Sequence, residues 1–139
     1  MYQVRIELTF DSGHRLLDYV GKCAYPHGHT YRAEVFLNGE TLDPIGLVYD
    51  FTLLKTRIKA WVDANWDHAF LVNSRDTELI DGLSSVTKNR LYTFADENPS
   101  CEVISRTLYQ KVRELCEVIP AKVRVWESLD QYAEYREGP

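Results

Sequence analysis

The residues from Tyr2 to Asp11 alternate strictly between apolar and polar side chains, and this pattern constrains the fold more than any other feature. The apolar set comprises Tyr2, Val4, Ile6, Leu8 and Phe10. Successive side chains of a β-strand point to opposite faces of a sheet, so the alternation predicts a strand with one covered and one exposed face. A chain that opens in this way must supply other elements to cover the apolar face.

A second strand is predicted to begin near His29. Its apolar face is formed by Tyr31, Ala33, Val35 and Leu37. The Asn38-Gly39 pair that follows is typical of a tight turn. Two shorter strands are predicted near the end of the chain, over 123–125 and 132–135, because β-branched and aromatic residues alternate there with polar ones.

Two amphipathic helices are predicted between these strands. The first follows Asp50, whose carboxylate can accept the free amide hydrogens of a first turn, and it ends near Trp66. The second follows Ser100, carries an apolar stripe and ends at Pro120. The segment 74–98 between them is polar and weakly periodic, and we expect a long loop with one helical turn there.

The order strand, strand, helix, helix, strand, strand indicates an α+β fold. We expect a four-stranded antiparallel sheet with two helices on one face. A length of 139 residues suits one domain, and no internal repeat or linker divides residues 1–139. Such a sheet has exposed edges, and pairing between subunits is a way to cover them.

Composition argues against several classes of protein. The net charge is −5, so no basic surface points to nucleic acid. No apolar run approaches the roughly 20 residues of a membrane helix, and the opening segment lacks the apolar core of a signal peptide. The three cysteines, Cys23, Cys101 and Cys116, have no spacing typical of a disulfide framework. We therefore expect a cytoplasmic protein with reduced thiols and neither a nucleic-acid nor a membrane partner.

Three of the four histidines are candidate metal ligands. His27 and His29 lie two positions apart, so on a strand they point to the same face. Imidazole nitrogen suits zinc, and His14, just beyond the end of the first predicted strand, is the candidate for a third ligand. The pattern thus predicts a zinc site, although histidines with this spacing are also common as ordinary core or surface residues.

Four further residues carry candidate chemistry, each with a plainer alternative. Asp67 and His68 are adjacent at a predicted helix end, and they form either a base oriented by a carboxylate or a helix cap. Cys23 is a metal ligand, a reactive thiolate or a buried filler. Glu127 shares its strand parity with 123 and 125, so it points inward and needs either a ligand rich in N–H donors or a neighbouring arginine.

Six short motifs, taken together, resemble the 6-pyruvoyl-tetrahydropterin synthase and 6-carboxy-tetrahydropterin synthase family over nearly the whole chain. Each motif is weak alone, but the six occur in the family's order. They are F-x-x-x-H-R-L at Phe10 to Leu16, C-x-x-x-H-G-H at Cys23 to His29, G-x-V-x-D-F at Gly46 to Phe51, Asp67-His68 with a nearby Leu-x-Asn, N-P-[ST]-x-E at Asn98 to Glu102, and Trp126-Glu127-Ser128.

This resemblance implies a fold, a substrate and a metal. The fold would be the tunnelling fold, in which the sheets of several subunits join into a barrel, usually a homohexamer. The substrate would be the small molecule 7,8-dihydroneopterin triphosphate. Zinc would be bound by His14, His27 and His29, and would act as a Lewis acid on the two side-chain hydroxyls of the substrate.

The resemblance also implies roles for the other candidate residues. Cys23, as a thiolate, would move the proton of the substrate side chain, and Asp67 with His68 would form a second proton relay. The carboxylate of Glu127 would bind the N–H edge of the pterin ring. The residues that fall where the family contacts the pterin are Ser100 and Cys101.

The spacing within one motif favours one branch of the family. Three residues between Cys23 and His27 are similar to the carboxy-synthase of queuosine and deazapurine biosynthesis, a zinc-dependent carbon–carbon lyase. The alternatives are the pyruvoyl synthase, which expels triphosphate and keeps all three side-chain carbons, and a non-catalytic protein that binds pterin or zinc. Two features depart from the family: the segment 74–98 is longer than usual, and Cys101 replaces the usual Ser or Thr.

Overall fold

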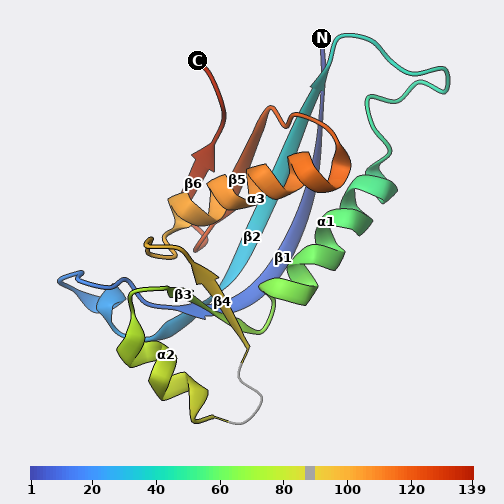
Figure 1. The fold of residues 1–139 in the computed structure, drawn as a ribbon. Coiled ribbons are helices and arrows are strands. Elements are labelled where there is room, and N and C mark those ends of the chain that lie inside the picture. Colours follow the sequence, from blue (N-terminus) through green and yellow to red (C-terminus); the bar gives the residue numbers. More distant parts are fainter. Residues whose placement is uncertain (87–89) are drawn as a thin grey trace.

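The structure is a computed structural model that describes residues 1–86 and 90–139 (Figure 1). It contains six strands, three α-helices and one 3-10 turn within these residues. In chain order the elements are β1 (Tyr2–His14), η1 (Lys22–Ala24), β2 (His27–Gly39), α1 (Phe51–Asn65), β3 (Ala69–Asn73), α2 (Thr77–Ser84), β4 (Leu91–Phe94), α3 (Cys101–Cys116), β5 (Lys122–Trp126) and β6 (Tyr132–Tyr135).

Two long strands form the centre of the sheet. β1 and β2 run antiparallel over 13 residues each, and their register pairs Phe10 with Tyr31, Ser12 with His29 and His14 with His27. The opening alternation is confirmed, because Ile6, Leu8 and Phe10 are buried. Residues 15–26 connect the two strands at the end of the sheet away from both chain termini (Figure 1).

The sheet is mixed and six-stranded, so the prediction of a four-stranded antiparallel sheet is wrong in strand number and direction. The strand order is β4-β3-β1-β2-β5-β6, with β3 parallel to β1 and β4 parallel to β3. The sequence of β3, AFLVN, is buried at four of its five positions. A parallel strand covered on both faces has a continuous apolar run rather than alternation, which is why periodicity did not reveal it.

The prediction of a long loop over 74–98 is also wrong for the described part of that segment. Asp76 caps α2, because its carboxylate accepts a hydrogen bond from the Leu79 amide at 3.3 Å. β4 follows at Leu91–Phe94, and residues 87–89 lie outside the described part of the chain. The predicted helical turn is therefore an eight-residue helix, and the sheet gains a strand.

The α+β class is confirmed, with α1 and α3 covering the same face of the sheet as predicted (Figure 1). Asp50 caps α1 by accepting hydrogen bonds from the amides of the second and third helical residues. The fully buried core side chains of these helices include Leu54, Ile58, Val62, Ile104, Leu108 and Val112. None of the helices in the described residues is long and apolar enough to cross a membrane.

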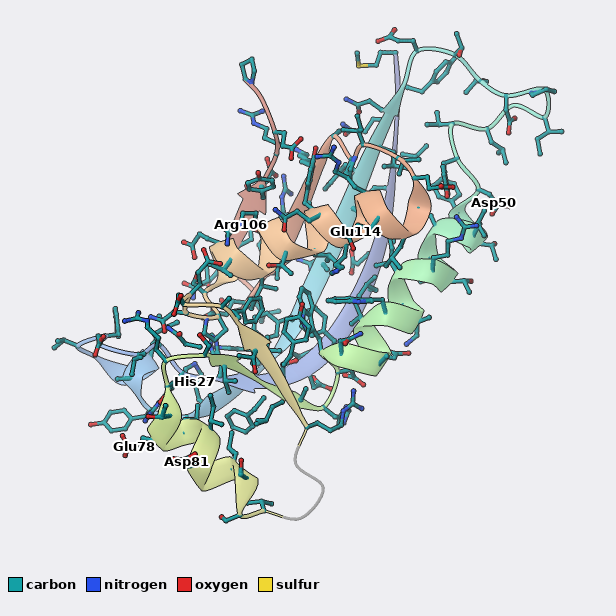
Figure 2. All side chains as sticks on the ribbon, in the orientation of Figure 1. His27, Asp50, Glu78, Asp81, Arg106 and Glu114 are labelled. Atoms are coloured by element: carbon teal, nitrogen blue, oxygen red, sulfur yellow. The ribbon has the colours of Figure 1, made fainter. Side chains whose placement is uncertain are left out.

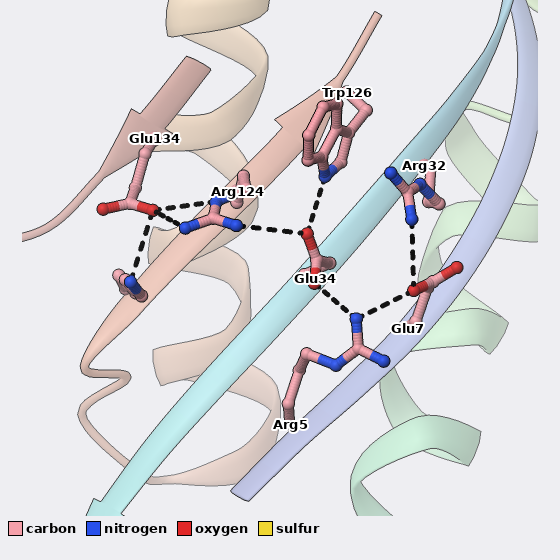
Figure 3. Close-up of polar contacts among 8 residues, drawn as sticks. Arg5, Glu7, Arg32, Glu34, Arg124, Trp126 and Glu134 are labelled. Atoms are coloured by element: carbon pink, nitrogen blue, oxygen red, sulfur yellow. Dashed lines mark hydrogen bonds and ion pairs between the residues drawn. The ribbon is translucent and has the colours of Figure 1, made fainter. Parts of the chain in front are cut away.

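The other face of the sheet carries a network of ion pairs (Figure 3). Its centre is Glu34, which is only 5% exposed and accepts hydrogen bonds from Arg5 at 2.5 Å and from Trp126 Nε1 at 2.6 Å. Burial opposes ionisation of Glu34, but these donors and the Arg124 guanidinium hold its pKa below the usual value. The residues of β1, β2 and β5 that point to this face are thus polar, and their charges are paired across neighbouring strands.

Candidate functional site

Three histidines converge at the end of the β1–β2 pair. His14 ends β1, His27 begins β2 directly opposite, and His29 follows on the same face of β2. One ring nitrogen from each of the three lies within 4.8 Å of the other two. Figure 2 labels His27 at the end of the sheet away from the termini. The structure thus brings together the three predicted ligands, on the face whose continuation is the buried core.

Backbone carbonyls fix the orientation of two of these rings. His14 Nδ1 lies 2.8 Å from the Pro99 oxygen, and His27 Nδ1 lies 2.7 Å from the Tyr25 oxygen. A carbonyl only accepts, so each Nδ1 carries the hydrogen and each Nε2 is left with its lone pair. These two Nε2 atoms face each other at 3.1 Å, an arrangement that requires a shared proton or a cation.

The third ring completes a donor set that suits zinc. His29 Nε2 is buried and has no hydrogen-bond partner within the described residues. Burial lowers the pKa of His14 and of His29, which keeps both imidazoles neutral and able to ligate a metal. Three imidazoles, two of them oriented by carbonyls, are the donor set of zinc sites that keep a fourth position open.

Glu127 lies beside the triad, and its carboxylate opens onto a pocket. Glu127 Oε1 is 3.3 Å from His29 Nε2, without hydrogen-bond geometry. A pocket of about 180 Å³ adjoins it, lined by Cys101, Glu102, Glu127, Gln131, Tyr132 and Ala133. The alternative of an arginine partner for Glu127 is wrong within residues 1–86 and 90–139, where its ion-pair partner is His29. The Glu127 side chain, which was predicted to point inward, therefore lines an open pocket.

Ser100 and Cys101 lie at the start of α3, at the edge of this pocket. Ser100 is the N-cap of α3, and its hydroxyl accepts a hydrogen bond from the Val103 amide at 3.2 Å. Cys101 is buried and its thiol donates to the Val125 carbonyl at 2.9 Å. Burial raises the pKa of Cys101 to about 12, so this residue is a thiol rather than a thiolate.

Cys23 lies in η1, in the connection between the two strands that carry the triad. It is a free, half-buried cysteine, and its carbonyl accepts a hydrogen bond from the Leu16 amide at 2.8 Å. Burial raises the pKa of Tyr31, and Glu127, Cys101 and Cys23 lie near enough to add to that shift. The Tyr31 hydroxyl in turn lies 3.2 Å from His14 Nδ1, so Cys23 belongs to the neighbourhood of the triad.

Asp67 and His68 form a hydrogen-bonded pair, with Asp67 Oδ2 2.9 Å from His68 Nδ1. The helix-cap alternative is wrong, because the C-cap of α1 is Trp66. Asp67 accepts the Asp11 amide at 2.9 Å, and this bond, with that of His68, holds the pKa of Asp67 below its usual value despite burial. His68 is 74% exposed at its side chain and has a left-handed φ of 57°.

This pair adjoins the face of the β1–β2 hairpin opposite to the three histidines. Strand alternation puts Asp11 and Thr30 on that face, and Thr30 donates to Asp11 at 2.5 Å. His68 lines a pocket of about 480 Å³ together with Asp11, Thr30 and residues 12–13 and 28–29, so His29 of the triad borders the same pocket. The triad therefore lies on one face of the β1–β2 pair, and the Asp11 and Thr30 side chains beside the Asp67–His68 pair lie on the other.

Several residues that shape the site were not predicted. The carbonyls of Pro99 and Tyr25 orient His14 and His27, Tyr31 lies under the triad, and Asp11 holds Asp67. Carbonyl contacts have no side-chain signature, but the N-P-S motif that contains Pro99 was a usable signal. An x-Pro bond fixes the backbone at a helix entry and so fixes the direction of its carbonyl.

Comparison with known proteins decides the family. The sequence profile named 6-pyruvoyl tetrahydropterin synthase matches residues 3–138. This chain belongs to that family. Among curated members, a Rickettsia bellii protein named 6-carboxy-5,6,7,8-tetrahydropterin synthase is 32% identical over 131 residues, covering 91% of this chain and 94% of that protein. A Haemophilus influenzae protein of the same name is 28% identical and covers 99% of this chain and 100% of its own length.

Solved structures from the family share the fold. A crystal structure of an uncharacterized Wolinella succinogenes protein matches with a TM-score of 0.82 at 20% identity, covering 99% of this chain and 98% of that one. The 6-pyruvoyl tetrahydropterin synthase of Caenorhabditis elegans matches with a TM-score of 0.71 at 24% identity, covering 99% of this chain and 98% of its own. The fold implied by the motifs, the tunnelling fold of this family, is confirmed for the single chain.

Proposed function

We propose that this protein is a zinc-dependent carbon–carbon lyase that converts 7,8-dihydroneopterin triphosphate and water to 6-carboxy-5,6,7,8-tetrahydropterin, acetaldehyde and triphosphate. This reaction belongs to queuosine and deazapurine biosynthesis. The names of the curated relatives support the carboxy-synthase branch, as does the three-residue spacing between Cys23 and His27. The substrate is a small molecule, and the acidic net charge of −5 favours neither nucleic acid nor an anionic membrane as a partner.

The observation that carries the proposal is the convergence of the three imidazoles beside a carboxylate-lined pocket. The Nε2 atoms of His14 and His27 face each other at 3.1 Å, and His29 Nε2 is buried without a hydrogen-bond partner in the described chain. Such a group is costly to bury unless a cation binds it. Zinc held by these residues would supply a Lewis acid for the two side-chain hydroxyls of the substrate.

The protein side chains would bind the ring and move the protons. Glu127 lies beside the triad and faces the pocket, so its carboxylate can accept hydrogen bonds from the N–H edge of a pterin ring. That contact would hold the substrate side chain over the triad. Cys23, in the connection above the same end of the sheet, would remove and return the side-chain proton as a thiolate. The buried thiol of Cys101 would pack against the ring without taking a proton.

The second proton relay, Asp67 with His68, is proposed to act in a neighbouring copy of the chain. In its own chain the pair adjoins the face opposite to the triad, with His68 exposed and Asp67 fixed to Asp11. A carboxylate at 2.9 Å orients the imidazole, as a general base requires. We therefore propose a homohexamer in which each active site combines a triad and Cys23 from one subunit with a relay from another.

The product decides between the enzymes of this family. Zinc-loaded protein incubated with 7,8-dihydroneopterin triphosphate should release acetaldehyde and 6-carboxy-tetrahydropterin in equal amounts. Triphosphate without acetaldehyde, and a pterin that keeps a three-carbon side chain, would instead identify a 6-pyruvoyl-tetrahydropterin synthase. Saturable pterin binding without any product would identify a non-catalytic binding protein. Either of these outcomes would overturn the proposal.

A further inference from the structure

The side chain of Asn98 binds the backbone of Leu17 in the connection between β1 and β2. Asn98 Oδ1 accepts a hydrogen bond from the Leu17 amide at 2.9 Å, and Asn98 Nδ2 donates to the Leu17 carbonyl at 2.9 Å. One carboxamide thus satisfies both backbone polar groups of one residue, much as a neighbouring strand would. Asn73, which is buried, donates a further bond to Asn98 Oδ1 at 3.1 Å and fixes the orientation of the amide.

The peptide held in this way leads directly to Cys23. The residue before Leu17 is Leu16, whose amide donates to the Cys23 carbonyl at 2.8 Å. The connection therefore folds back on itself, and the position of 16–17 determines the position of η1. Beyond this bond and the internal turn of η1, the backbone hydrogen bonds within the described chain leave residues 18–24 without a strand partner.

Pro99, the residue after Asn98, contacts the start of the same connection, at His14. The Pro99 carbonyl accepts the hydrogen bond from His14 Nδ1 at 2.8 Å, and Pro99 itself is buried. Two consecutive residues, 98 and 99, therefore contact both a predicted zinc ligand and the peptide from which the Cys23 connection departs. The Asn98-Pro99 unit leads into α3, which packs against the sheet. Its position is therefore fixed relative to His14 and to the Leu17 backbone.

We propose that Asn98 is a positioning residue for Cys23. Its carboxamide fixes the Leu17 peptide and thereby sets where the Cys23 thiol lies relative to His14 and to a substrate bound there. The consequence for turnover rests on the proposed function, whereas the consequence for the Cys23 connection does not. Proton transfer demands heavy-atom approaches within about 0.5 Å of the productive geometry, so a loosened connection loses rate rather than substrate affinity.

The test is Asn98→Ala in zinc-loaded protein. We expect kcat to fall at least tenfold, while KM and the zinc content stay within threefold of wild type, because His14 keeps the Pro99 carbonyl. We also expect iodoacetamide to alkylate Cys23 at least threefold faster, measured by peptide mass spectrometry. The thiols of Cys101 and Cys116 are buried and serve as internal references whose alkylation should not change.

Two further variants separate positioning from general loosening. Asn98→Asp keeps an acceptor for the Leu17 amide but sets a carboxylate oxygen against the Leu17 carbonyl, so its kcat should fall and its alkylation rate rise at least as far as in Asn98→Ala. The matched control is Asn65→Ala, which removes a carboxamide whose Nδ2 donates to the Trp61 carbonyl at 2.9 Å, far from this connection in sequence. This control should match wild type in kcat and in Cys23 alkylation.

The outcomes are distinct. A kcat and a Cys23 alkylation rate within twofold of wild type in Asn98→Ala would overturn the inference, as would faster alkylation of all three cysteines, which indicates general loosening. If Asn98→Ala does not fold, Asn98→Asp takes its place, and its kcat and Cys23 alkylation rate are measured instead. If wild-type protein makes no acetaldehyde, the proposed function fails, but faster alkylation of Cys23 alone would still support the inference.

Discussion

The ion pair between Arg15 and Asp76 offers the sharpest test of the part of the fold that periodicity did not predict. Arg15 Nε and Nη2 donate to the two carboxylate oxygens of Asp76 at 2.7 and 2.5 Å, a bidentate arrangement. Asp76 is 2% exposed and also caps α2, while Arg15 directly follows the zinc-ligand candidate His14. Replacing Asp76 therefore removes the link between α2 and the strand that ends at the triad.

The size of the effect follows from burial and geometry. Breaking a buried pair costs about 3–5 kcal/mol, and the Arg15 side chain, at 16% exposure, suggests the lower end of that range. The lost N-cap adds about 1 kcal/mol. We expect Asp76→Ala to lower the free energy of unfolding by about 4 kcal/mol, which corresponds to about 12 °C in Tm for a domain of this size. Asp76→Asn keeps the cap and should cost about 2–3 kcal/mol.

The assay is thermal and urea unfolding at fixed protein concentration, with Asp81→Ala as the matched control. Asp81 lies on the exposed side of α2 and makes no ion pair among the described residues, so its loss should cost less than about 0.5 kcal/mol (Figure 2). Zinc content should be unchanged in Asp76→Ala, because His14 keeps its Pro99 contact and its strand pairing. A loss below 1 kcal/mol in Asp76→Ala would refute the reasoning.

The same pair predicts a pH dependence. The hydrogen bonds from Arg15 hold the pKa of Asp76 below its unfolded value of about 3.9, despite the opposing effect of burial. A depressed pKa means that the ionised carboxylate stabilises the folded state above pH 4, and that this contribution is lost as the pH falls through the folded pKa. The difference between wild type and Asp76→Asn should therefore be full at pH 7 and shrink below pH 4.

Three other predictions concern the proposed site. Chelation of zinc should lower Tm by about 8–9 °C, since zinc at 100 times its Kd contributes about 2.7 kcal/mol, and His27→Ala should lose both the metal and this response. Cys23→Ala should keep fold and zinc but lose turnover by a factor of at least 10²; full activity would make the thiol a bystander, and lost zinc would make it a ligand. Light scattering should give six times the 16.2 kDa chain mass, whereas an active monomer would contradict a shared site.

The sequence predicts the triad because the period of a strand is two. Once β2 begins at His27, the alternation that buries Tyr31 and Ala33 also turns His27 and His29 to the same face. His14 requires only that the neighbouring strand be antiparallel, which the short connection favours. The inward direction of Glu127 followed from extending the same rule one residue past the end of β5. These inferences needed only local patterns and one pairing.

The missed elements and contacts lack such a pattern. β3 and β4 pair parallel with strands distant in sequence, and four-residue β4 is too short for periodicity to be read. The cap at Asp76 was readable, but its partner Arg15 lies 61 residues away. The orientation of the imidazoles depends on the carbonyls of Pro99 and Tyr25. Every residue type has a backbone carbonyl, so residue identity does not reveal these contacts. Long-range pairing and backbone contacts are therefore the information that only the folded chain contains.

The arrangement of the two half-sites follows from the same period of two. Asp11 and Ser12 are neighbours in β1, yet Ser12 pairs with His29 on the triad side while Asp11 binds Asp67 through its amide and Thr30 through its side chain. A side-chain rotation cannot carry His68 through the sheet to the other face. The exposure of His68 on its own face leaves it free to meet the triad of another copy, which is the arrangement proposed above.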